Sequence, residues 1–139
     1  MLNFYYKDFI ETFLNKSIEE IIGSISLSNQ FDSTINQNKS WEQQIHILKK
    51  ALDGYCGTIF FEFSIPRMGK RVDCLVIIVN IVFVIEFKVG ENEFLSYNID
   101  QVWDYALDLK NFHKPSHSAV LAPILVLKQA RFKKPRQSS

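Results

Sequence analysis

Two carboxylates and one lysine interrupt the most apolar part of this 139-residue chain. Asp73 lies in the run RVDCLVII, and Glu86 and Lys88 lie in the run IVFVIEFK that follows. A buried ion costs several kcal/mol unless it is paired or bound to a metal. Carboxylates that face each other also repel, so a divalent cation between them would explain their presence. These residues are the first candidates for chemistry.

The segment that carries them is predicted to be two strands joined by a tight turn. Val, Ile and Phe dominate residues 72–78 and 81–88. Val79 and Asn80 lie between the two runs, and Asn tolerates the positive φ that two-residue turns need.

The length of this turn decides whether the two acids meet. A two-residue turn pairs Ile78 with Ile81 and so places Asp73 directly opposite Glu86, with Cα atoms roughly 4.5–5.5 Å apart. Side chains alternate along a strand, so Lys88 joins the same face. A three-residue turn would place Asp73 opposite a phenylalanine instead.

The same alternation divides the apolar side chains between two faces. The face of the acids also carries Leu75, Ile77, Val82 and Val84. The other face is predicted to carry Val72, Cys74, Val76, Phe83, Ile85 and Phe87. Strands that are apolar on both faces are typical of a sheet covered by helices on both sides. An alternative explanation of the charges is a structural salt bridge of Lys88 with either acid.

A further strand is predicted over residues 58–65 (TIFFEFSI), followed by a turn at 66–70. With the turn taken at about residues 67–70, the hairpin places Ser64 opposite Asp73, with Glu62 one step along the same face. Glu62 either joins an acidic cluster or pairs with a basic neighbour, and we expect the second.

The N-terminal part is predicted to be helical. Residues 4–14 have near-helical spacing, and an S-x-x-E capping box at residues 17–20 opens a second helix. Residues 28–39 are polar and aperiodic, which is typical of a surface loop. A second capping box at residues 40–43 opens an amphipathic helix that ends at Gly54. Glu42 would lie in its first turn, where acidic residues are common because the helix dipole stabilises negative charge.

A last helix is predicted over residues 99–112 and a last strand over residues 119–127. The helix has the packing stripe Ile99, Val102, Trp103, Ala106, Leu109 and Phe112. Gln101 and Tyr105 project together beside it, and the row Asp100, Asp104 and Asp108 is expected to face solvent. Pro123 indicates an edge position for the strand.

This order of elements, with Asp73, Glu86-Phe-Lys88 and Gln101-x-x-x-Tyr105 in place, resembles the PD-(D/E)XK nuclease superfamily in its RecB-like, Q-x-x-x-Y branch. The phrases FEFSIPRMGKR, FVIEFKVG and DQVWDYALDLKNFH are similar to those of the nuclease-like N-terminal domain of Schlafen-related bacterial helicase-like ATPases. The resemblance covers roughly residues 4–127.

The resemblance implies an α/β fold with a three-layer restriction-endonuclease-like core: a helix, a three-strand antiparallel meander, a helix and a strand. It divides the chain into an N-terminal helical extension and loop (1–39), the nuclease-like core (40–127) and a basic, disordered tail (128–139).

The resemblance also implies the site. Asp73 and Glu86 would ligate Mg²⁺, for which Mn²⁺ can substitute, and Glu42 would complete the metal site. Lys88 would orient the attacking water and steady the developing charge. The pair on the last helix, Gln101 and Tyr105, would position the site or the backbone phosphate.

Two departures from the family pattern are visible. Val72 precedes Asp73 where the motif has Pro, and the chain contains no G-x-x-x-x-G-K-[ST] phosphate loop. The chain therefore reads as a single-domain nuclease-like module or a truncated relative of a nuclease–helicase protein. The expected partners are nucleic acid and a helicase or ATPase domain or protein.

Composition sets weak bounds. The formal charge is +1, but residues 128–139 hold five of the sixteen basic residues and no acid, leaving eleven basic against fifteen acidic residues elsewhere. Two cysteines are too few for a disulfide framework. The longest apolar stretch is interrupted by Asn80 and too short to span a bilayer, so we expect a cytoplasmic protein without a membrane partner.

The sequence thus predicts a Mg²⁺-dependent nuclease. The alternatives are a catalytically inactive module of the same fold that binds nucleic acid or protein, and a structural fragment whose acids are ordinary charge pairs. DNA and RNA, and internal and terminal cleavage, remain open.

Overall fold

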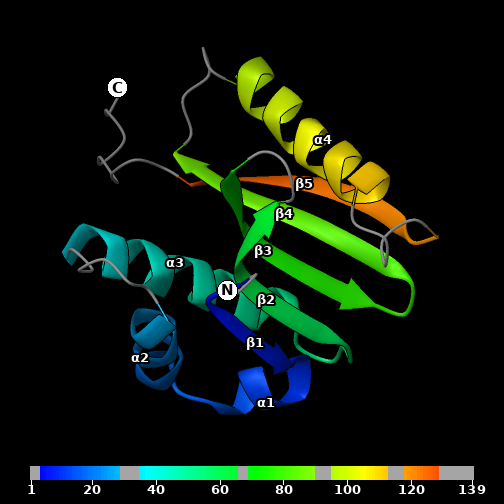
Figure 1. Ribbon diagram of the computed structural model, residues 1–139. Helices are drawn as coiled ribbons and strands as arrows, with labels where there is room; N and C mark the ends of the chain where they lie inside the picture. The colour runs from blue at the N-terminus through cyan, green and yellow to red at the C-terminus, as the bar shows by residue number, and fades with distance from the viewer. Residues whose placement is uncertain (1–3, 29–34, 66–68, 90–94, 113–117, 129–139) are drawn as a thin grey trace, which may run out of the picture.

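The computed structural model describes residues 4–28, 35–65, 69–89, 95–112 and 118–128 (Figure 1). Its elements are, in chain order, β1 (Tyr6–Phe9), α1 (Ile10–Asn15), α2 (Ile18–Ser28), α3 (Ile35–Ala51), β2 (Thr58–Ile65), β3 (Lys70–Ile78), β4 (Ile81–Val89), α4 (Leu95–Phe112) and β5 (Val120–Lys128).

All five strands form one sheet in the order β1-β2-β3-β4-β5. The first four run antiparallel to their neighbours, whereas β5 is parallel to β4. Two adjacent parallel strands need a crossover connection, and the 18-residue α4 lies within it (Figure 1). The fold is therefore mixed α/β, with the predicted order of a helix, three antiparallel strands, a helix and a strand from α3 onward.

Helices cover both faces of the sheet (Figure 1). On one face, side chains of α1, α2 and α3 such as Phe13, Ile21 and Trp41 form a core with Phe61 and other strand residues. On the other face, α4 packs against β2, β3 and β4 in a second core. Because both faces of the sheet are covered, the strands carry apolar side chains on both faces. No helix in the described part of the chain is long and apolar enough to cross a membrane.

The predicted register of the central hairpin is confirmed. Ile78 pairs with Ile81, and the ladder continues to Cys74 opposite Ile85. The connection is therefore the two-residue turn of Val79 and Asn80. The positive φ, 58°, falls on Val79.

The predicted register of the preceding hairpin is wrong. Ser64 pairs with Arg71, not with Asp73. The register is shifted by two residues, because Ile65 already pairs with Lys70 and the connection therefore begins one residue earlier than we assumed. Glu62 lies at the level of Asp73, because the residues that flank Glu62 on β2 pair with the residues that flank Asp73 on β3.

The N-terminal prediction is correct only in part. Ser17 and Glu20 form the predicted capping box, since each backbone amide donates to the other side chain over 3.1 Å. The segment before it, however, begins with strand β1, which pairs with β2. A four-residue strand is too short to show a period of its own, and its pairing partner is distant in sequence.

The predicted start of the third helix is also wrong. Because α3 begins at Ile35, the second capping box lies inside it. The Ser40 hydroxyl accepts a hydrogen bond from the side-chain amide of Gln44 over 3.3 Å. Glu42 is therefore not in a first turn, and the boundary at residues 39 and 40 falls within a helix. Residues 29–34 of the predicted loop lie outside the described residues, as does the predicted basic tail beyond Lys128.

The strained turn residue gives a stability test. Val79 is 91% exposed with φ at 58°, a conformation that a β-branched residue adopts only at a cost of about 1–2 kcal/mol. We expect Val79→Gly to raise the free energy of unfolding by about 0.5–1 kcal/mol in urea denaturation, since strain relief outweighs the added chain entropy. Val120→Gly, at an exposed valine within β5, is the control and should lower it; destabilisation by both would contradict the strain.

Candidate functional site

Three acids lie at one level across the three central strands: Glu62 on β2, Asp73 on β3 and Glu86 on β4. The regular backbone pairing is interrupted here, because Glu62 and Asp73 are skipped between β2 and β3 and the ladder between β3 and β4 ends one residue before Asp73. Side chains take the place of the missing backbone contacts. The structure thus brings together Asp73 and Glu86, as the turn length predicted, and adds Glu62.

Each acid of the central pair binds the backbone of the other strand. The Phe87 amide donates to Asp73 Oδ2 over 2.8 Å, and the Asp73 amide donates to Glu86 Oε1 over 3.4 Å. One oxygen of each carboxylate is therefore engaged with a backbone amide. These contacts hold the two carboxylates close together and fix their orientation.

A reversal of the strand alternation produces this arrangement on β2. Phe61 belongs to the core under α1, α2 and α3, yet Phe63, two residues later, belongs to the core under α4. Residues two apart on a regular strand share one face, so the chain must turn over between them. Glu62 has a φ of 56°, and the Arg71 guanidinium donates to its carbonyl over 2.7 Å in place of a strand partner.

The same reversal occurs on β3 at Asp73. Cys74 belongs to the core of the N-terminal helices, whereas Val72 belongs to the core under α4. The predicted placement of Val72 with Cys74 is therefore wrong. The other nine apolar residues that were assigned to a face of the central hairpin lie on their predicted faces.

Glu62 is a half-buried acid in an unfavourable setting. Burial, and then the neighbouring Asp73 charge, raise its pKa to about 7. The Trp41 indole donates to Glu62 Oε2 over 3.3 Å, and this contact together with Arg71 opposes the rise. Among the described residues the Glu62 carboxylate forms no ion pair, and Arg71 binds the backbone carbonyl instead. An acid in the middle of TIFFEFSI was the signal that pointed to it.

Glu86 is more strongly affected. Its side chain is 4% exposed, and burial followed by hydrogen bonding and charge repulsion from Asp73 raise its pKa far above the usual range of a carboxyl. Lys88 acts in the opposite direction. Glu86 thus takes up a proton more readily than an ordinary carboxyl does. The same acids affect the buried Cys74 thiol, because its pKa is raised by burial and then by the charges of all three acids.

Lys88 is half-buried next to this cluster. Its charge influences Glu86, but in the described part of the chain it forms no ion pair, and the pair that is present there joins Lys16 to Asp8 over 2.9 Å. The structural salt bridge that would have explained Lys88 by itself is therefore not formed. The ammonium lies near the acids without being held by either.

The helix α4 contributes the two remaining predicted residues. Tyr105 is 3% exposed and belongs to the core that also contains Phe63 and Val72, which flank the acids. Gln101, one turn earlier, is half-buried, and its Oε1 is buried without a hydrogen-bond partner among the described residues. An unsatisfied buried carbonyl is uncommon and costs about 1–3 kcal/mol, so Gln101 is available for a ligand.

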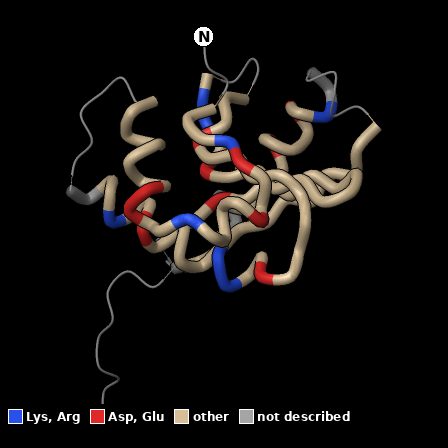
Figure 2. The backbone as a smooth tube through the Cα atoms, turned by 90° about the horizontal axis from the view of Figure 1, so that it is seen from below, with Lys and Arg blue, Asp and Glu red and all other residues tan. Residues whose placement is uncertain are grey.

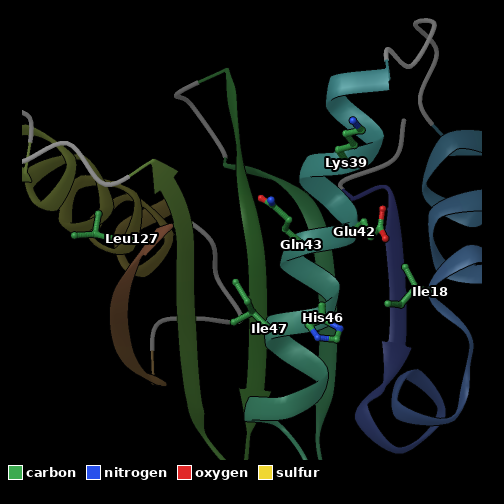
Figure 3. A pocket seen from close by; sticks show the side chains of 7 residues that line it. All are labelled: Ile18, Lys39, Glu42, Gln43, His46, Ile47 and Leu127. Carbon is green, nitrogen blue, oxygen red and sulfur yellow. The ribbon is translucent and has the colours of Figure 1, made fainter. Parts of the chain in front are cut away.

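Glu42 does not join the cluster. It is exposed, and it lines a cavity of about 660 Å³ with Lys39, Gln43 and His46 of α3, Ile18 of α2 and others (Figure 3). Figure 3 shows Glu42 on the side of α3 that is turned toward Ile18. Its neighbour Trp41, not Glu42, reaches the acids. The expected contribution of Glu42 to the site therefore has no contact in the structure to support it.

The donor set suits a hard cation. Described residues contain no group of three or more His, Cys, Asp or Glu side chains that could hold a metal ion. Mg²⁺, however, keeps several waters and commonly binds proteins through one or two carboxylates. Asp73 and Glu86 provide two.

No family model, curated protein or solved structure matches the chain.

Burial of the acids predicts a pH dependence of stability. The folded protein binds the Glu62 proton more tightly than the unfolded chain does, so this contribution is full below pH 4.5 and is lost as the pH rises to about 7. We expect Glu62→Gln to reduce the fall in unfolding free energy between pH 5 and pH 8 by about 2 kcal/mol in urea denaturation. Exposed Glu42→Gln is the matched control. Equal pH profiles for Glu62→Gln and the unsubstituted protein would contradict the burial.

Proposed function

We propose that the chain is a divalent-metal-dependent phosphodiester hydrolase, a nuclease, with its centre at Asp73, Glu86 and Lys88. The observation that carries the proposal is the carboxylate pair on adjacent strands, buried Glu86 and half-buried Asp73, beside a lysine that forms no ion pair with the described residues. Glu86 is almost fully buried next to another carboxyl, which is an unstable place for an acid unless a proton or a cation lies between the two.

The architecture supports the proposal. α3, the antiparallel β2, β3 and β4, the crossover α4 and the parallel β5 follow one another as in the restriction-endonuclease-like core that the sequence resemblance implies. Asp73 lies on the second strand of this meander and Glu86 and Lys88 on the third. We propose that the chain has this core, with β1, α1 and α2 as an N-terminal addition.

Each residue has a role that its position suits. A bound Mg²⁺ would neutralise a phosphate oxygen and lower the pKa of a water. Asp73 and Glu86 would hold the cation, with waters as its remaining ligands. Lys88, which forms no ion pair with the described residues, would orient the attacking water and stabilise the charge that develops on the phosphate.

α4 would form the second wall of the site. The free carbonyl of Gln101 is suited to accept a hydrogen bond from a bound water or a ribose hydroxyl, and buried Tyr105 would fix the position of the helix.

Nucleic acid is the proposed substrate, although the basic residues in the described part of the chain do not gather on one face. Figure 2 shows Lys and Arg dispersed over several elements, with Asp and Glu between them. Attraction of the phosphate backbone would then depend largely on the bound cation and Lys88. Binding without metal is expected to be weak.

A non-catalytic binding module is the second candidate. It is favoured by the hydrogen bonds that Asp73 and Glu86 already make to backbone amides, since these give the carboxylates a structural role without any metal. Such a module would retain nucleic acid or a partner protein and cleave nothing.

A cleavage assay separates the two. We expect labelled DNA or RNA, single- or double-stranded, to be cut with Mg²⁺ or Mn²⁺, and the rate to fall about a hundredfold or more in Asp73→Asn, Glu86→Gln and Lys88→Met. Each substitution keeps the size of the side chain, so folding is preserved and can be checked by circular dichroism.

Two exposed residues of α3 provide controls. Glu42→Gln and Lys50→Met change charge away from the acids and should leave the rate unchanged. Cleavage that survives all three central substitutions, or that requires Glu42, would overturn the assignment. Metal-independent retention of nucleic acid without cleavage would select the binding module.

A further inference from the structure

The outer side of α4 carries an apolar row where an amphipathic helix would be polar. Ile99, Trp103 and Leu107, spaced four residues apart, are 40%, 53% and 51% exposed. The sequence pattern predicts Ile99 and Trp103 as core residues, and this prediction is wrong; Phe112, in the same predicted stripe, has a side chain outside the described set. Residues four apart lie on one side of a helix, so the three form a continuous exposed stripe.

This stripe continues into a groove beside the edge strand. A cavity of about 340 Å³ lies between Trp103 and Leu107 of α4 and Val120 and Leu121 of β5. Val120 is itself 56% exposed. In Figure 1, α4 runs along β5, so the groove lies between the helix and the outermost strand of the sheet. Adjoining exposed apolar side chains on a helix and a strand are typical of an interaction surface.

An acidic row accompanies the apolar one. Asp100 and Asp104 are exposed and follow Ile99 and Trp103 by one residue, about 100° around the helix. Asp108 continues the row; it is half-buried, and its Oδ2 has no hydrogen-bond partner among the described residues. The stripe therefore has carboxylates along one border.

We propose that this surface, the Ile99, Trp103 and Leu107 stripe with the β5 groove, docks a basic amphipathic helix of a partner protein. Apolar side chains of the partner at helical spacing fill the groove, and its Lys or Arg side chains pair with Asp100 and Asp104. The carboxylates of Asp100 and Asp104 favour this occupant, while Lys110, which also lines the groove, donates to the Ala119 carbonyl over 3.2 Å. Phosphates of a nucleic acid meet the carboxylates unfavourably.

A second copy of the chain is also disfavoured. Packing two α4 helices antiparallel about a two-fold axis places their acidic rows on the same side, where the like charges repel. The stripe is also separate from the proposed catalytic centre. Trp103 lies two residues, about 200° around α4, from Gln101 and from Tyr105, and so the two functions occupy different sides of one helix.

The surface contains its own reporter. The chain has two tryptophans, and Trp41 is 1% exposed while Trp103 is half exposed. As a probe we choose a synthetic amphipathic helical peptide of Leu and Lys, with a peptide of Leu and Glu in the same pattern as its counterpart. The Lys peptide should shift the tryptophan emission to shorter wavelength as Trp103 leaves water, and added salt should weaken the binding. The Glu peptide should cause no shift.

Variants locate the contact. Leu107→Gln should weaken binding of the Lys peptide about tenfold by opening the apolar contact, and the double substitution Asp100→Asn, Asp104→Asn should remove much of its salt dependence. Leu27→Gln, at a 90% exposed leucine of α2, is the matched control and should bind as the unsubstituted protein does.

Three results would overturn the proposal. One is equal binding of the Lys and Glu peptides, or equal loss in Leu27→Gln and Leu107→Gln. Another is a dimer in sedimentation velocity that Leu107→Gln dissociates, which would assign the surface to a second copy. The third is displacement of the Lys peptide by an oligonucleotide that itself binds at this surface. Loss of oligonucleotide binding in Leu107→Gln would show that it does.

Discussion

The close approach of Asp73 and Glu86 is the constraint on which the rest of the structure depends. It follows from a two-residue turn, because one more residue between β3 and β4 would move Glu86 out of reach. At this level the backbone ladder gives way to the hydrogen bonds from Phe87 to Asp73 and from Asp73 to Glu86. The chain also turns over at Glu62, so the carboxylates gather where the sheet is least regular. Strained or irregular backbone of this kind is common at functional sites.

The two helical layers determine how this irregular region behaves. Trp41 of α3 binds Glu62 from one side, while Tyr105 of α4 packs in the core beneath the other face. Between them the acids are kept from water, which raises the pKa of Glu62 and Glu86 and makes a proton or a cation necessary. The same helix α4 presents an acid-bordered apolar stripe on its outer side. One helix would thus connect a proposed catalytic centre with a proposed docking surface.

Local rules predicted part of this arrangement. Turn length and alternation were sufficient for the Asp73 and Glu86 register, and the Ser17 capping box and the edge position of β5 followed from short motifs. What failed depended on distant contacts. β1 forms only against β2, and a positive φ at Glu62 cannot be read from residue type. Trp103 was misplaced because α4 is apolar on two sides, and spacing does not show which side meets the sheet. The metal, the substrate and the roles of Lys88 and Gln101 remain predictions.

The most direct test of the central claim is a crystal structure of the protein grown with Mn²⁺, with diffraction data recorded for anomalous scattering. Mn²⁺ takes the same oxygen ligands as Mg²⁺ and can be located by its own signal. The account predicts an anomalous peak between the carboxylates of Asp73 and Glu86, with Lys88 nearby, that is lost in Glu86→Gln. A structure without a peak at this position, or with a peak only at Glu42 and His46 on α3, would contradict it.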